Sequence, residues 1–156
     1  MKSKIKNSKG FTLVELLGAF SIMIILMAIV TGIFMNFRNS QSLGKDTEMT
    51  LSVLRQARSQ TLTSQNGTNY GVHFGTTKIT LFVGNTYSAG ASTNIDFILT
   101  GSDTVMAITL VGGGSDIIFK RLSGETSQNG TIVLTSTITG STKTVTVYKT
   151  GLIESN

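Results

Sequence analysis

The residue types that carry chemistry in enzymes are sparse in this 156-residue sequence and do not gather into a motif. The absence of cysteine excludes disulfide scaffolds, thiol catalysis and cysteine-based zinc sites. His73, the only histidine, lies in an alternating, strand-like stretch, where a structural role is far more common than catalysis. Asp96, Asp103 and Asp116 lie on three segments without the spacing of a calcium loop. We therefore expect neither an enzyme nor a bound metal or other cofactor.

One carboxylate has an unusual setting, because Glu15 is the only ionisable side chain between Phe11 and Met35. Residues 12–15 fit a capping box, in which Thr12 is the N-cap and Glu15 reaches back to its backbone N–H. A carboxylate here also complements the helix dipole, by about 0.3 to 1 kcal/mol. An ionised carboxylate deep in hydrocarbon costs roughly 2.5 to 3.5 kcal/mol, so capping alone explains Glu15 poorly. We expect it to have a partner.

The apolar run that follows Glu15 predicts a membrane helix. Leu16 to Met35 carries no charge and, at about 1.5 Å per residue, spans a hydrocarbon core of roughly 30 Å. An ordinary signal peptide has a shorter apolar region, of about 7 to 15 residues. The positive-inside tendency keeps the preceding lysines in the cytoplasm: Lys2, Lys4, Lys6 and Lys9. We therefore expect a single-pass protein of the cytoplasmic (inner) membrane, N-terminus inside and C-terminus outside.

Cleavage between Gly10 and Phe11 would supply the missing partner of Glu15. It would create an α-amino group one helical turn away, mostly protonated at neutral pH. At about 4 Å and an effective dielectric constant of 20, the Coulomb attraction is near 4 kcal/mol. That attraction would offset the burial of Glu15 only inside an assembly of helices, where the pair would set the register between neighbouring copies.

The sequence GFTLVE at residues 10–15, preceded by lysines and followed by about twenty apolar residues, resembles the class III signal of type IV pilins and type II secretion pseudopilins. The resemblance implies cleavage after Gly10 by prepilin peptidase and N-methylation of Phe11. It also implies that Glu15 pairs with the Phe11 amine of an adjacent subunit. The chain lacks both proline and the cysteine pair of many major pilins, which favours a minor subunit. The alternative is an uncleaved signal anchor that carries a capping box.

Residues 36–48 turn polar, and the pattern leaves open a bend near Gly44 or one helix from Thr12 to about Gln65. In residues 49–66 the stripe Leu51, Leu54 and Leu62, with Arg58 on it, predicts an amphipathic helix that ends at Asn66-Gly67. The segment LRQARSQT at residues 54–61, ahead of a β-rich body, resembles the H-type (fimbrial-tip-like) minor pseudopilins. We assign no chemistry to Arg58 or Gln60.

From Tyr70 onward the apolar period becomes that of β-strands, separated by glycine-containing turns. About seven strands, ending in a hairpin over residues 131–151, predict a mostly antiparallel sheet or two small sheets that pack on the helix. The fold class is therefore α+β. The expected divisions are a leader (1–10), a transmembrane and assembly helix (11–35), a polar connection with the second helical half (36–66) and a β-rich head (67–156).

The two resemblances imply a minor pilin-like structural subunit of a type II secretion pseudopilus or its tip, exposed as a periplasmic or cell-surface fibre. Expected partners are other pilins or pseudopilins, prepilin peptidase, the assembly machinery and membrane lipid. Without the four leader lysines, nine of the thirteen basic residues face eight acidic ones, so charge does not favour DNA. The alternative is a minor pilin of a type IV pilus or DNA-uptake fibre, for adhesion or DNA capture. In that case the basic residues of the head would contribute: Lys120, Arg121, Lys143 and Lys149.

Overall fold

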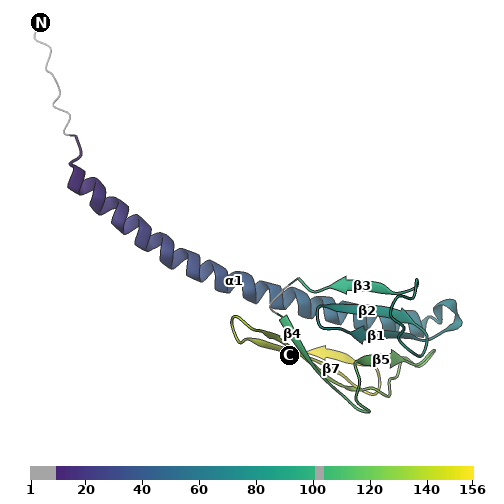
Figure 1. Ribbon diagram of the computed structural model, residues 1–156. Coiled ribbons are helices and arrows are strands. Elements are labelled where there is room, and N and C mark those ends of the chain that lie inside the picture. The colour runs from purple at the N-terminus through teal and green to yellow at the C-terminus, as the bar shows by residue number, and fades with distance from the viewer. Residues whose placement is uncertain (1–9, 101–103) are drawn as a thin grey trace, which may run out of the picture. The chain divides into compact units, whose positions relative to one another are not determined.

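A computed structural model describes residues 10–100 and 104–156, without the side chains of Asn36 and Asn39 (Figure 1). The predicted leader lysines and Asp103 therefore lie outside the described residues. One helix, α1, covers Leu13–Leu62 and contributes to two compact units, residues 1–37 and 38–156. Residues 36–48 are helical throughout, because α1 continues through Gly44.

The second half of α1 buries one stripe of side chains that includes several threonines. Their hydroxyls donate to the carbonyl four residues back, at 2.8 Å for Thr47, 2.7 Å for Thr50 and 2.8 Å for Thr61. A threonine satisfied in this way can be buried like a small apolar residue. The stripe is Leu43, Asp46, Thr47, Thr50, Leu51, Leu54, Ala57 and Thr61, with Val53 beside it.

The predicted stripe was therefore partly wrong. Leu51 and Leu54 are buried, whereas Leu62 is 38% exposed and Arg58 is half-buried. The buried face runs through Thr50, Leu54 and Thr61, so Leu62 lies one residue, about 100° around the helix, beyond Thr61. The leucine pattern misplaced the face because it counted the threonines as polar.

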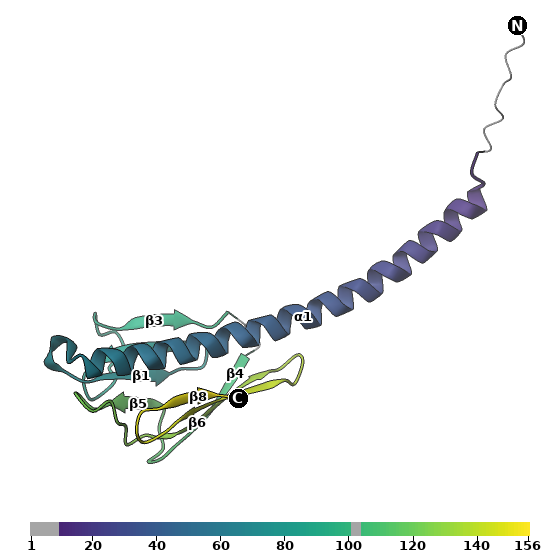
Figure 2. The ribbon, with the colours of Figure 1, turned by 180° about the vertical axis from the view of Figure 1, so that it is seen from behind.

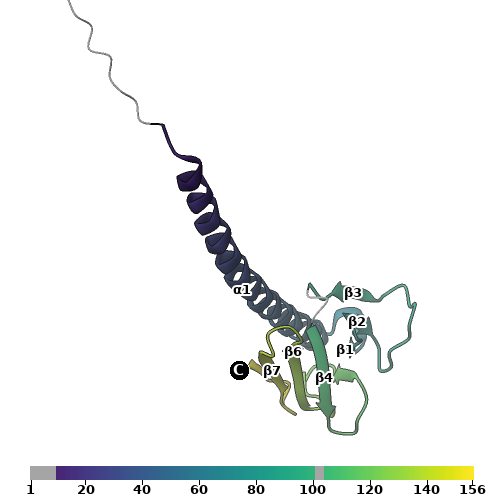
Figure 3. The same ribbon diagram turned by 60° about the vertical axis from the view of Figure 1, so that its left-hand side comes forward.

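Two four-stranded antiparallel sheets form the rest of residues 38–156, after a short 3₁₀ turn, η1 (Gln65–Gly67). The first sheet has the order β3-β2-β1-β5 and the second the order β4-β6-β7-β8. Figure 3 shows β3, β2 and β1 grouped apart from β4, β6 and β7. The strands are β1 (Tyr70–Phe74), β2 (Lys78–Val83), β3 (Ile95–Ile98), β4 (Thr104–Leu110), β5 (Asp116–Phe119), β6 (Gly130–Ser136), β7 (Thr142–Val147) and β8 (Ile153–Ser155).

Both sheets and the second half of α1 share one hydrophobic core. Leu54 of α1, Ile117 of the first sheet and Val145 of the second are all fully buried in it. Figure 2 shows α1 running alongside strands of both sheets. The predicted α+β fold is confirmed, as is the hairpin, which is β6 and β7 paired from Gly130↔Val147 to Thr135↔Thr142. The eighth strand, β8, was not predicted from the sequence.

A buried carboxylate of α1 holds the crossover between the two sheets. Asp46 is 0% exposed; its Oδ1 accepts from the Thr100 backbone N–H at 2.7 Å and its Oδ2 from the Thr104 hydroxyl at 2.9 Å. Thr100 follows β3 and Thr104 begins β4, so one side chain fixes where the chain leaves the first sheet and enters the second. Hydrogen bonds to a buried carboxylate are among the stronger ones in proteins.

Candidate functional site

The N-terminus of α1 carries the capping box that the sequence predicted. The Glu15 backbone N–H donates to the Thr12 hydroxyl at 3.3 Å, and the Thr12 backbone N–H donates to Glu15 Oε2 at 3.4 Å. The Thr12 hydroxyl also lies 3.4 Å from the same carboxylate oxygen. This reciprocal pattern satisfies helix-end donors that otherwise have no partner, and it fixes where α1 begins.

The capping box does not use the full capacity of the Glu15 carboxylate. Its bonds are longer than the usual N–H···O distance of about 2.9 to 3.0 Å, and they involve only Oε2. Within the described residues Oε1 has no hydrogen-bond partner, and Glu15 is exposed. A carboxylate has about four acceptor positions, so Glu15 can cap α1 and still receive a positive group.

Beyond Glu15, the first half of α1 exposes an almost unbroken apolar surface. Leu13 is 74% exposed, Ile24 68% and Ile33 67%. Among the described residues, α1 is the one helix long and apolar enough to cross a membrane. An apolar surface of this extent marks a membrane or protein contact rather than a water-facing helix.

Two hydroxyl side chains in this apolar surface are satisfied within the helix itself. The Ser21 hydroxyl donates to the Leu17 carbonyl at 2.8 Å, and the Thr31 hydroxyl donates to the Met27 carbonyl at 2.7 Å. In hydrocarbon an unsatisfied donor would cost several kcal/mol, so this bonding suits the helix to a lipid or protein interior. Glu15 is the one acidic residue in this half of α1.

The fold gives no reason for the glycines of this segment. A Cβ at Gly10, Gly18 or Gly32 would meet nothing within 4 Å, and none of the three has a positive φ. Inside a helix, glycine costs about 1 kcal/mol relative to alanine. For Gly18 and Gly32, which lie inside α1, the described chain shows neither a close contact nor a backbone conformation that requires glycine, and the same holds for Gly44.

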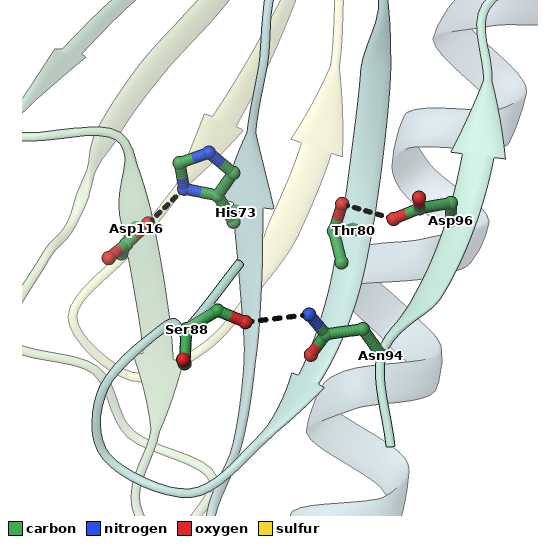
Figure 4. Close-up of polar contacts among 6 residues, drawn as sticks. All are labelled: His73, Thr80, Ser88, Asn94, Asp96 and Asp116. Atoms are coloured by element: carbon green, nitrogen blue, oxygen red, sulfur yellow. Dashed lines mark hydrogen bonds and ion pairs between the residues drawn. The ribbon is translucent and has the colours of Figure 1, made fainter. Parts of the chain in front are cut away.

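On the head, a polar row crosses the first sheet. Asp96 (β3), Thr80 (β2), His73 (β1) and Asp116 (β5) are register neighbours, and Figure 4 shows their contacts. The Thr80 hydroxyl donates to Asp96 Oδ1 at 2.6 Å, and Lys78 Nζ lies 2.7 Å from Asp96 Oδ2. The hydrogen bond from Lys78, followed by that from Thr80, lowers the pKa of Asp96, while Asp96 raises the pKa of Lys78.

At the other end of the row, His73 is held on two sides. Its Nδ1 lies 2.6 Å from Asp116 Oδ1, and its ring stacks on Tyr87 with centroids 3.8 Å apart and planes 4° from parallel. Tyr87 also packs edge-on against Phe82, with ring centroids 5.7 Å apart. The loop that carries Tyr87 is closed by the Asn94 side chain, which donates to the Ser88 carbonyl at 2.9 Å (Figure 4). These contacts give His73 and Asp116 a structural role.

The row brings Asp96 and Asp116 to opposite edges of one sheet and does not bring them together. Within residues 10–100 and 104–156, no group of three histidine or acidic side chains could hold a metal ion. Of the basic residues considered for DNA, all four are exposed, and Arg121 Nη1 donates to the Gly67 carbonyl at 2.8 Å.

Arg58 and Gln60 were given no role from the sequence. In the described structure, each has a buried polar atom without a hydrogen-bond partner: Arg58 Nε and Gln60 Oε1. Each lines a separate surface pocket, with Arg58 beside Gly151 and Gln60 beside Tyr70. Both residues belong to the segment at residues 54–61 that carries the family resemblance. The sequence of that segment does not reveal which of its polar atoms lack a hydrogen-bond partner in the fold.

An α+β head on a long helix with an exposed apolar first half defines a type IV pilin-like architecture. Residues 5–31 match the family model of the prokaryotic N-terminal methylation motif, so the chain has a pilin-like N-terminus suited to membrane anchoring. Comparison with curated proteins and with solved structures gives no match.

Proposed function

We propose that this chain is a minor pilin-like structural subunit, cut between Gly10 and Phe11 by prepilin peptidase and N-methylated at Phe11. The mature subunit is stored in the membrane through α1 and is then extracted into a type II secretion pseudopilus or its tip. The methylation motif at residues 5–31 carries this proposal, together with the exposed apolar surface that directly follows Glu15.

The arrangement around Glu15 supports a role in assembly. Cleavage would leave a positive amine on Phe11 of each subunit, and one oxygen of Glu15 has no hydrogen-bond partner among the described residues. Pairing with the amine of a neighbouring copy would offset the cost of placing a carboxylate among apolar helices. The unexplained glycines of α1 would then permit close approach of neighbouring helices.

The structure of the head does not by itself distinguish a secretion pseudopilus subunit from a type IV pilus subunit or from a plain membrane-anchored domain. A type IV pilus or DNA-uptake fibre would use the same N-terminus, with Lys120, Arg121, Lys143 and Lys149 as DNA contacts. In a duplex-binding assay with a salt series, real phosphate contacts must weaken steeply as salt rises. A rival of another class, an uncleaved membrane-anchored β domain, would need neither cleavage nor a charged Glu15.

The first experiment measures the N-terminal mass of the full chain, expressed with and without a prepilin peptidase. We expect a mature chain that begins at methylated Phe11 only when the peptidase is present. Gly10→Leu should block cleavage without unfolding the head, since a side chain at Gly10 meets nothing within 4 Å. Gly18→Leu is the matched control, equally open, and should be cleaved. An intact chain both with and without the peptidase would refute the proposed processing and would favour the uncleaved membrane-anchored β domain.

The second experiment separates capping from assembly at Glu15. Glutamine also serves in a capping box, so Glu15→Gln preserves the cap and removes only the charge. In cells with the assembly machinery, we expect Glu15→Gln to be cleaved normally but to appear in sheared fibres about tenfold less than the parent chain, because the amine pair is lost. Normal incorporation would show that Glu15 acts only as a cap.

A further inference from the structure

One pocket of the head has no part in the proposed function. It lies between the last turns of α1 and the turn before β8 and has a volume of about 370 Å³. Two cations and several apolar side chains line it: Arg55, Arg58, Leu62, Leu152 and Ile153, with Gly151 at its wall. A volume of this size accommodates a small ligand or one or two side chains of a protein partner.

Two glycine turns hold Arg58 in this pocket. Gly151 has a φ of +78°, and a Cβ there would overlap the Gly124 carbonyl oxygen and come within 2.7 Å of Arg58 Nε. A Cβ at Gly124 would come within 2.9 Å of Leu62 Cδ2 and 3.2 Å of Arg58 Nε. The two backbones therefore lie directly against the side chains of α1 and limit where the guanidinium can go. Preorganisation of this kind lowers the entropic cost of binding.

The guanidinium groups of the pocket have unused hydrogen-bonding capacity. Arg58 Nε is buried against the glycine turns and has no partner among the described residues. Arg58 Nη2 reaches the Thr150 carbonyl only at 3.4 Å, in an exposed contact, so it is a donor that a ligand can engage. The ion pairs of the described chain are His73–Asp116 and Lys78–Asp96, so neither Arg55 nor Arg58 has an acidic partner there. The nearby carboxylate of Glu154 instead accepts from the Tyr148 hydroxyl at 3.1 Å.

We propose that this pocket binds a carboxylate side chain on an apolar segment of a partner protein. An arginine guanidinium presents parallel N–H donors that fit a carboxylate, and lysine does not reproduce this geometry. The apolar part of the wall suits the flanking residues of such a segment; Leu62 is 38% and Leu152 48% exposed. Single-stranded nucleic acid is bound by a positively charged groove that tracks its backbone, together with stacking aromatic side chains. Apart from Ser59 and Gly151, the remaining lining residues of this pocket are aliphatic, and none of the lining residues is aromatic.

The test uses the full chain, ¹⁵N-labelled in detergent micelles, and follows the Arg58 Nε–H resonance during peptide titration. The probe is N-acetyl-Leu-Glu-Leu amide, and the matched control peptide carries glutamine in place of glutamate. We expect a saturable shift with the glutamate peptide and roughly tenfold weaker binding of the glutamine peptide, because charge-assisted bonds are much the stronger. Arg55→Gln should weaken binding about threefold, as expected for an exposed ion pair. Arg38→Gln removes the same charge from α1 outside the pocket and should leave binding unchanged.

Three results would overturn the proposal: no saturable shift, an equal response to the two peptides, or unchanged binding by Arg55→Gln. A shift produced by duplex DNA or inorganic phosphate but not by the glutamate peptide would assign the pocket to phosphate and also refute it. The pocket lies wholly in the head and needs no cleavage at Gly10. Its failure would therefore leave the proposed processing and assembly untouched.

Discussion

The two halves of α1 differ in what explains their residues. In the half that belongs to the head, the fully buried Asp46 and Thr61 have partners elsewhere in the chain: Asp46 accepts from Thr100 and Thr104, and Thr61 accepts from Tyr70. In the first half, by contrast, the large apolar side chains are exposed. An exposed apolar surface of this extent points to something outside the chain, in keeping with membrane anchoring through α1.

The largest expected effect comes from comparing Gly151, in a turn of the head, with Gly18, in the first half of α1. Gly151→Ala places a methyl group against the Gly124 carbonyl at a positive φ, so we expect a loss of more than about 3 kcal/mol in unfolding free energy. Gly18→Ala, in open space, should leave unfolding of the head unchanged. Urea unfolding of the full chain in detergent, followed by near-ultraviolet circular dichroism, measures both. Equal stability of the two variants would break the comparison.

Asp46 is expected to come next. Asp46→Ala leaves the Thr100 N–H and the Thr104 hydroxyl without this acceptor, which should cost about 2 to 3 kcal/mol and loosen the crossover between the sheets. Glu48→Gln, at an exposed position two residues along α1, is the control and should change stability by less than about 0.5 kcal/mol. Hydrogen exchange at the Thr100 amide provides a local readout. Retained protection there in Asp46→Ala would contradict the role of the carboxylate.

Two buried threonines of α1 provide a matched pair with a smaller difference. The Thr61 hydroxyl donates to the Ala57 carbonyl and also accepts from the Tyr70 backbone N–H at 3.1 Å. Among the described residues, the Thr50 hydroxyl bonds only the Asp46 carbonyl of its own helix. Thr61→Val therefore leaves a buried N–H unpaired and should cost about 1 to 2 kcal/mol. Thr50→Val, equally buried, should cost less than about 1 kcal/mol. Urea unfolding midpoints measure both losses of stability. A larger loss of stability in Thr50→Val than in Thr61→Val would contradict the role given to the Thr61–Tyr70 hydrogen bond.

Local features were predictable from the sequence because they depend on neighbouring residues. The capping box spans residues 12–15, and the β6–β7 hairpin follows from alternating residues around a turn. The eighth strand was not predicted because β8 has three residues, too few to show an alternating pattern. The buried role of Asp46 was not predicted because its partners lie 54 and 58 residues away. Nothing local distinguishes it from the exposed acidic Glu48.

The residues of the candidate site also differ in whether the sequence could predict them. Glu15 could be singled out because it is the one ionisable residue in a long apolar run, which the sequence alone shows. The pocket around Arg58 could not be predicted, since it requires the Gly124 and Gly151 turns to meet at the end of α1. Tyr87 was missed for the same reason, because its stacking on His73 depends on how a loop folds over the sheet.

The smallest expected effect concerns the exposed Lys78–Asp96 pair. Because hydrogen bonds from Lys78 and Thr80 lower the pKa of Asp96 below its ordinary 3.8, the folded state binds that proton less readily than the unfolded state. The contribution is present above about pH 4 and is lost as pH falls through the lowered pKa. Because the pKa of Lys78 is raised above its ordinary 10.5, its contribution to stability is present below that pH and is lost only as pH rises through the raised pKa. Between about pH 4 and pH 10, the contribution of this pair to stability should therefore not change with pH. Urea midpoints of the parent chain and Asp96→Asn should differ slightly at pH 6 and converge below pH 3, with the difference reduced by salt. A difference that grows on acidification would show that the pair does not act through the charge of Asp96.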